Sequence, residues 1–171
     1  MIGMAYPLYV AMPDMFIAPD GKEWAARLDD GRLVVSNLDH DTFTTDQWQQ
    51  RLGMVPTLDS LELPPDNQQL RCNNDGCVYH HGAHTIAMPI TEPALLEDCQ
   101  HADIIIAHVA VRDCAATIII DEQALWMKGA HTISFDGDNV RVQSARSERG
   151  LRPWSVGWKT RAQQEKEEGE E

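Results

Sequence analysis

The stretch from Asp98 to Asp136 constrains the fold of this chain most strongly, because two β-branched apolar runs, a helix pattern and a hairpin pattern follow one another within it. Two β-branched runs, Asp103–Val109 and Thr117–Ile120, have the length and composition of strands that are buried on both faces. Runs of this kind lie at the centre of a sheet that is covered on two sides. The stretch therefore predicts where the core of an α/β layered domain lies.

The residues that follow these runs predict a helix and then a hairpin. Asp121 suits the N-cap of the helix, and Gly129 stands where a left-handed residue ends it. The pattern then alternates between apolar and polar residues on both sides of the turn Asp136–Asn139. This alternation predicts two antiparallel strands over residues 130–144.

The chain before this stretch reads as a β-meander followed by helices and a second hairpin. Short strands separated by Asp-Gly turns are predicted at Met15–Ala18, Trp24–Leu28 and Arg32–Ser36. A helix that begins at Thr44 or Thr45 and carries Trp48 is expected to cover them. Further strands and a short helix are predicted at Gln69–Cys72, Cys77–His80, His84–Met88 and Pro93–Cys99.

Charge divides the chain into one globular part and an acidic end. The formal net charge is -13, and residues 163–171 hold five Glu against one Lys. The expected organisation is a lead-in over residues 1–13, a single domain over 14–158 and a disordered acidic tail over 159–171. No apolar run reaches the roughly 18 residues that a membrane span requires, and the first residues lack the features of a signal peptide.

Four cysteines allow two interpretations. Cys72 and Cys77 stand at the two stems of a predicted hairpin, where the Cα atoms of neighbouring strands are close enough for a disulfide. Cys99 and Cys114 lie on either side of the predicted 103–109 strand, so they can pair only if the chain turns back after Val111. The alternative for both pairs is a buried, reduced thiol.

Histidines near these cysteines raise the question of a metal site. His80, His81 and His84 lie close in sequence, but neighbouring strand residues such as His80 and His81 face opposite sides of a sheet. The Asp39-His40-Asp41 segment contains a further His and two carboxylates, and these also suit a turn. The alternative of a metal site at His40, Asp41, His80 and His84 therefore stays weak, and no metal or other cofactor is expected.

One segment of this acidic chain is basic. Residues 140–162 hold six Lys or Arg residues against a single Glu, together with Trp154 and Trp158. Cations interleaved with flat aromatic rings are typical of surfaces that bind single-stranded nucleic acid. The candidate DNA-binding residues are Arg141, Arg146, Arg149, Arg152 and Trp154. The alternative is that these arginines are solvent-exposed counterions of an acidic body.

Four sequence blocks together resemble the C-terminal soluble region of the ComEC family, the DNA-internalisation channels of natural competence. The blocks are CNNDGCV (72–78), EDCQHADIIIAHVAVRDC (97–114), IIIDEQALWMKGAH (118–131) and RSERGLRPW (146–154). A weaker similarity extends to residues 14–35 and 46–53. The resemblance thus covers most of residues 14–154, and it rests on the order and spacing of the blocks.

The resemblance implies a fold, a location and a role. In the family this region follows a membrane-embedded channel domain and resembles a metallo-β-lactamase fold, for which a nuclease role has been proposed elsewhere in the family. The metal signature of that fold, two His flanking one residue and then Asp-His, has no match here. This chain is therefore similar to a branch with a degenerate site. An extracytoplasmic, periplasmic location follows, in which the paired cysteines could oxidise.

The expected fold is α/β in the broad sense of α+β: a degenerate metallo-β-lactamase-like layered structure with mixed strands and short helices. The expected function is that of a non-catalytic accessory domain that contacts transforming DNA. Its expected partners are weakly bound DNA, single-stranded in particular, and the channel domain of the same protein, with no small-molecule substrate. Two alternatives remain: a metal-dependent hydrolase or nuclease, and a small structural or protein-interaction domain.

Overall fold

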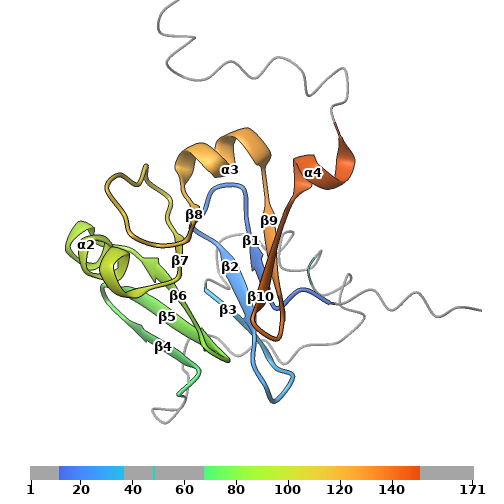
Figure 1. The fold of residues 1–171 in the computed structure, drawn as a ribbon, viewed down its shortest axis with the longest axis horizontal. Coiled ribbons are helices and arrows are strands. Elements are labelled where there is room, and N and C mark those ends of the chain that lie inside the picture. Colours follow the sequence, from blue (N-terminus) through green and yellow to red (C-terminus); the bar gives the residue numbers. More distant parts are fainter. Residues whose placement is uncertain (1–11, 37–47, 49–67, 151–171) are drawn as a thin grey trace, which may run out of the picture.

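A computed structural model describes residues 12–36, 48 and 68–150 of the chain, and the helix and strand bounds below refer to these residues. They contain two sheets of five strands each and short helices (Figure 1). The fold is therefore of mixed α+β type, as the sequence predicts at the level of class. None of the helices in this part of the chain is long and apolar enough to cross a membrane.

The first sheet is antiparallel throughout and joins the beginning of the described chain to its end. Its strands follow the order β10-β9-β1-β2-β3. Figure 1 shows the blue strands of the meander beside the orange and red β9–β10 hairpin. The predicted meander is confirmed, but its pairing with the hairpin was not predicted. The strands are β1 (Met15–Ile17), β2 (Trp24–Arg27), β3 (Leu33–Val35), β9 (His131–Asp136) and β10 (Asn139–Ser144).

The second sheet is mixed and follows the order β4-β5-β6-β7-β8. Strands β4, β5 and β6 pair antiparallel, whereas β7 and β8 add in parallel. The parallel pairs require crossover connections, which α2 and the segment after β7 supply. The strands are β4 (Leu70–Asn73), β5 (Gly76–His81), β6 (His84–Pro89), β7 (Ile104–Ile106) and β8 (Ile118–Ile120).

Local sequence signals determine the helix ends. Helix α2 (Glu92–His101) begins after Thr91 and has a proline in its first turn. Helix α3 (Glu122–Lys128) starts at the predicted cap, where the Asp121 carboxylate accepts a hydrogen bond of 2.9 Å from the Ala124 amide. Gly129 ends α3 with a positive φ of 75°, although its ψ of -154° lies outside the left-handed helical region. Helix α4 (Ala145–Arg149) follows β10 directly.

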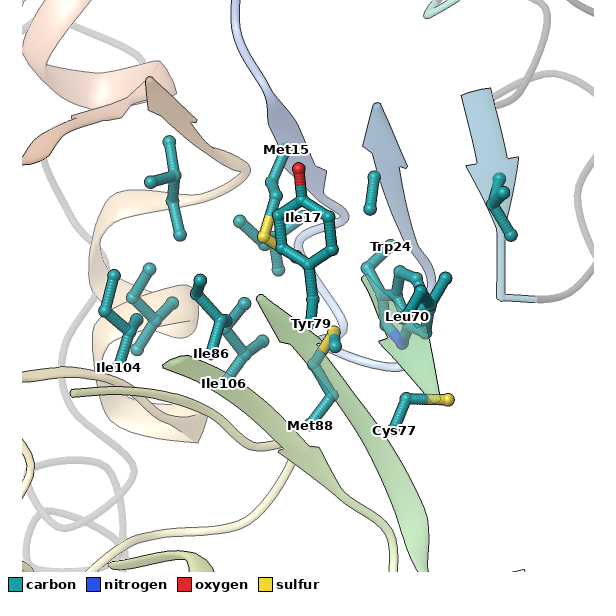
Figure 2. Close-up of a cluster of buried hydrophobic side chains, with 14 of the residues drawn as sticks. Met15, Ile17, Trp24, Leu70, Cys77, Tyr79, Ile86, Met88, Ile104 and Ile106 are labelled. Carbon is teal, nitrogen blue, oxygen red and sulfur yellow. The ribbon is translucent and has the colours of Figure 1, made fainter. Parts of the chain in front are cut away.

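The main core lies between the two sheets, which face each other across it. Met15 and Ile17 of the first sheet meet Leu70, Tyr79, Ile86 and Ile104 of the second, and all six side chains are at most 1% exposed. Figure 2 shows the Tyr79 ring in the space between the sheets, directed toward Met15. Burial of large apolar side chains on both sides is what holds the sheets together.

Each sheet also has an apolar outer face. On the first sheet, Phe16 and Leu33 pack with Trp48, whose ring centroid lies 5.8 Å from that of Phe16. Trp48 is the one described residue of the helix that was expected to cover the meander, and it lies against the meander as expected; the rest of that predicted helix lies outside the described residues. On the second sheet, Ile105 packs against Cys99 of α2. Buried residues on the outer faces show that each sheet is covered over part of its second side.

The structure corrects two expectations about the central runs. The first forms a strand of three residues, β7, because the chain leaves the sheet after Ile106. The second run was expected to be buried on both faces, but Ile119 is 37% exposed. Strand β8 pairs only with β7 among the described residues, so it is an edge strand. An apolar run alone does not separate a central strand from an edge strand.

Candidate functional site

Three arginine positions of the basic segment, 141, 146 and 149, lie on one continuous strand–helix unit. Ser144 ends β10 and caps α4: its hydroxyl accepts from the Ser147 amide at 3.1 Å, and the Ser147 hydroxyl accepts from the Ser144 amide at 2.9 Å. This capping box fixes the angle between strand and helix. Arg141 is exposed on β10. The unit therefore fixes the backbone positions of Arg141, Arg146 and Arg149 relative to one another.

Arg146 differs from the other candidates because it is bound within the protein. Its guanidinium donates a 3.0 Å hydrogen bond to the carbonyl of Met127, in the last turn of α3. This carbonyl is among those that a helix end leaves without a helical partner, so Arg146 joins α4 to α3. The exposed Lys128 follows Met127 and adds a cation that the sequence reading did not include. The side chain of Arg149, and Arg152 and Trp154 altogether, lie outside the described residues.

The three neighbouring histidines are divided between the two faces of β5 and β6. The His80 ring lies on the outer face, where its Nδ1 is 3.3 Å from the Thr85 hydroxyl. The His81 and His84 rings stack on Phe135 of the other sheet, with centroid distances of 4.4 and 5.4 Å. The prediction that His80 and His81 face opposite sides is confirmed. His40 and Asp41 lie outside the described residues. Within the described residues, no group of three side chains could hold a metal ion.

A buried polar chain connects the sheets next to these rings. Asp14 forms an ion pair with Arg27 and accepts a 2.8 Å hydrogen bond from the Phe135 amide. The Tyr79 hydroxyl donates to the Arg27 carbonyl at 2.7 Å and lies 3.1 Å from Nδ1 of His81. Since the Tyr79 proton points to the carbonyl, Nδ1 of His81 is the donor in that contact. Burial, together with the charge of Asp14, raises the pKa of Tyr79 far above its usual range.

The first pair of cysteines is bonded across two neighbouring strands. The amide of His80 donates to the carbonyl of Gln69 at 2.7 Å, and hydrogen-bonded pairs alternate along β4 and β5 from that point. Cys72 and Cys77 therefore form a non-hydrogen-bonded pair, the kind in which opposite Cα atoms come closest. Their Cα atoms are 4.1 Å apart and their sulfurs are bonded.

The second pair connects α2 to the crossover between β7 and β8. Cys99 and Cys114 are also bonded, with Cα atoms 4.9 Å apart. The sequence required the chain to turn back after Val111 for this bond, and the chain does so, since the Ala115 amide donates to the Cys99 carbonyl at 3.1 Å. The strand between the two cysteines, β7, has three residues and is shorter than the predicted 103–109 strand.

A groove lies between the outer face of the β4–β5 hairpin and α2. Helix α2 packs over β6 and leaves the outer face of β4 and β5 open beside it. The resulting cavity has a volume of about 470 Å³, within the range of about 300–1,000 Å³ that is usual for ligand sites. The lining residues that bear on its chemistry are Arg71, Asp75, Val78, His80, Pro93, Ala94, Glu97 and Asp98. The sequence analysis did not identify this site, because its two walls are separate segments.

The walls of the groove are held in place by the turn between β4 and β5. The Asn73 side chain accepts from the amides of Asp75 and Gly76 at 2.8 and 3.0 Å. The carbonyl of Asp75 in turn accepts from the Ile90 amide at 2.7 Å, just before α2. At Gly76, with φ of 155°, a Cβ atom would lie 2.6 Å from the Met88 carbonyl oxygen. Only glycine fits this position, which brings the turn against the start of α2.

Comparison with protein-family models, with curated proteins and with solved structures found no match to this chain.

Proposed function

We propose that this chain is a non-catalytic, extracytoplasmic accessory domain of a ComEC-like DNA-uptake channel, and that it contacts the passing DNA through its basic segment. The observation that carries the proposal is the capped β10–α4 unit, which presents Arg141 and the α4 arginine positions as one rigid element. Cations carried on a fixed backbone lose less backbone freedom on binding a phosphate backbone than cations on a flexible tail. Lys128, at the end of α3, extends the same surface.

Two further features support the proposal. Both cysteine pairs are bonded, and disulfides persist in oxidising compartments such as the periplasm. The two facing sheets carry buried clusters on their outer faces as well as between them. This arrangement supports the proposed degenerate metallo-β-lactamase-like layering. The division of His80 from His81 and His84 supports a role without a catalytic metal.

The test is a binding titration with single-stranded DNA at low salt. A variant with Arg141, Arg149 and Arg152 changed to Ala removes the proposed contacts and keeps Arg146, which the fold uses. Three phosphate contacts give a slope of log affinity against log salt of about -2 for single strands. We expect the wild-type chain to show this slope and the triple variant to lose most of it.

The matched control changes two exposed arginines outside the segment, Arg71 and Arg112, to Ala. This variant alters the net charge almost as much, so it separates a local contact from a general charge effect. We expect its DNA affinity to fall much less than that of the triple variant. Equal losses in both variants, or no DNA binding by the wild-type chain, would leave the basic segment as a counterion surface and refute the proposal.

A further inference from the structure

The groove between β4–β5 and α2 has a composition unlike that of the basic segment. Its charged lining consists of the carboxylates of Asp75, Glu97 and Asp98 against the single guanidinium of Arg71. A phosphate backbone is repelled by such a lining, so the groove does not extend the DNA surface. A ligand that matches this lining carries a positive charge.

The carboxylates on α2 are not neutralised within the described part of the chain. The ion pairs found there join Arg27 to Asp14 and Arg32 to Asp30, so Arg71 pairs with neither Glu97 nor Asp98 although it lines the same cavity. Asp98 is only partly exposed. Burial, and then the adjacent charge of Glu97, raise the pKa of Asp98 above its ordinary value. His101 partly opposes this rise in the pKa of Asp98, and a cation bound beside the carboxylate would oppose it further, because an opposite charge favours the ionised form.

Apolar residues lie next to these carboxylates. Val78 on β5 and Pro93 and Ala94 on α2 line the same cavity. On α2, Ala94 is separated from Asp98 by one helical turn, so apolar and acidic positions follow each other along one wall. A ligand that places an aliphatic stem against the former and a charged head against the latter matches this order. Lysine and arginine side chains have this construction.

The groove is also preformed. The Cys72–Cys77 bond fixes β4 to β5, and the Cys99–Cys114 bond fixes α2 one residue after Asp98. The hydrogen bond from the Ile90 amide to the Asp75 carbonyl closes one end. Each wall is thus cross-linked or tied independently of any ligand. A site that needs no ordering on binding loses less free energy when it is occupied.

We propose that this groove binds an ammonium or guanidinium group on an aliphatic stem, with Glu97 and Asp98 as the anionic contacts and Val78, Pro93 and Ala94 as the apolar contacts. The same chemistry occurs in a basic side chain of a partner polypeptide and in a free aliphatic diamine. The proposal is independent of DNA contact, because it uses residues on another element and of the opposite charge.

The experiment follows backbone amide chemical shifts of the full 171-residue protein, labelled with ¹⁵N, at pH 8. One probe is the blocked tripeptide acetyl-Ala-Lys-Ala-amide, and the other is 1,5-diaminopentane. We expect saturable shifts confined to residues 71–80 and 93–98, with dissociation constants of roughly millimolar size, as befits a small ligand. Tighter binding of the peptide identifies a polypeptide partner, whereas tighter binding of the diamine identifies a small-molecule ligand.

Two variants and one altered probe complete the test. Changing Glu97 to Gln and Asp98 to Asn together should weaken binding roughly tenfold or more, since both charge-assisted contacts with the bound cation are lost. The matched variant, Glu122→Gln with Asp136→Asn, removes two exposed carboxylates elsewhere and should bind as the wild-type chain does. A peptide with norleucine in place of lysine should not saturate the shifts.

The proposal is overturned if neither probe gives saturable shifts, if the norleucine peptide binds equally, or if the two variants lose affinity alike. DNA titration of the Glu97 and Asp98 variant should match that of the wild-type chain. Failure of the proposed cation binding and failure of the proposed DNA binding are therefore seen in separate measurements.

Discussion

Asp14 joins the two strands that flank β1, β2 and β9, through a single carboxylate. One oxygen pairs with Arg27 on β2, and the other accepts from the amide of Phe135 on β9. The residue is 5% exposed, whereas the Arg27 side chain is 33% exposed, so removal of Asp14 would leave a partly buried guanidinium and the Phe135 amide without their acceptor. In the sequence Asp14 is one of many acidic residues, and it follows a proline. No local pattern distinguishes it as a core residue.

We predict that Asp14→Ala lowers the free energy of unfolding by about 2 kcal/mol, because it leaves the Phe135 amide and the partly buried Arg27 guanidinium without their acceptor. The measurement is urea denaturation at neutral pH. The matched control is Asp30→Ala, which breaks the exposed pair with Arg32 and should cost less than about 1 kcal/mol. Similar losses for the two variants would contradict the structural role given to Asp14.

His131 makes the fold sensitive to acid. It is 4% exposed, its Nδ1 has no hydrogen-bond partner within the described chain, and burial lowers its pKa. The unfolded chain therefore takes up a proton at a higher pH than the folded chain does. The stability contributed by neutral His131 is complete above about pH 6.5 and is lost as the pH falls below that value toward the lowered pKa.

We predict that the difference in unfolding free energy between the wild-type chain and His131→Leu shifts in favour of the variant between pH 7.5 and pH 5. One proton sets an upper limit of about 1.4 kcal/mol per pH unit on this shift. Urea denaturation at four pH values measures it, and the carboxylates common to both proteins cancel in the difference. A difference that does not change with pH would show that His131 titrates normally in the folded chain.

At the scale of elements, sequence patterns predicted those features that depend on residues close to one another in the chain. The meander, the Asp121 cap, the β9–β10 turn and the opposite orientations of His80 and His81 all depend on spacing within a few positions. The pairing of β1 with β9 and the groove beside α2 depend on contacts between distant segments. A single sequence does not identify such contacts, because each strand could pair with several other strands of similar composition.

The two disulfides are expected to differ in their contribution to stability. The Cys99–Cys114 bond closes a loop three times as long as the Cys72–Cys77 bond, with sequence separations of 15 and 5. Loop-closure entropy then gives about 3 kcal/mol for the longer loop and about 2 kcal/mol for the shorter one.

The prediction is that Cys99→Ser with Cys114→Ser lowers the unfolding free energy more than Cys72→Ser with Cys77→Ser. Urea denaturation of both double variants under non-reducing conditions measures the two losses, and the wild-type chain with reductant serves as the reference for losing both bonds. If the short-loop variant is the less stable of the two, packing at the β4–β5 hairpin outweighs the entropic effect.

At the scale of the whole molecule, charge is arranged by element. The chain carries a net charge of -13, yet the capped β10–α4 unit is basic and the groove beside α2 is acidic. The second sheet supplies β4 and β5 to the groove, whereas the first sheet supplies β10 to the basic unit. The proposed DNA contact and the proposed cation site thus belong to different sheets, so each can be altered without changing the other.

The first sheet also sets an order of events for a newly made chain. Its β1 strand pairs with β9, with Met15 opposite Ile133, so its central pair waits for about 120 further residues to be synthesised. At about 5–20 residues per second this interval lasts roughly 6–24 seconds. Throughout it, the β1 edge of the nascent meander lacks the strand that will cover it, and unpaired edges favour association with other chains. Binding of a chaperone to the exposed β1 edge, or retention of the chain at its site of synthesis, would prevent this association during the interval.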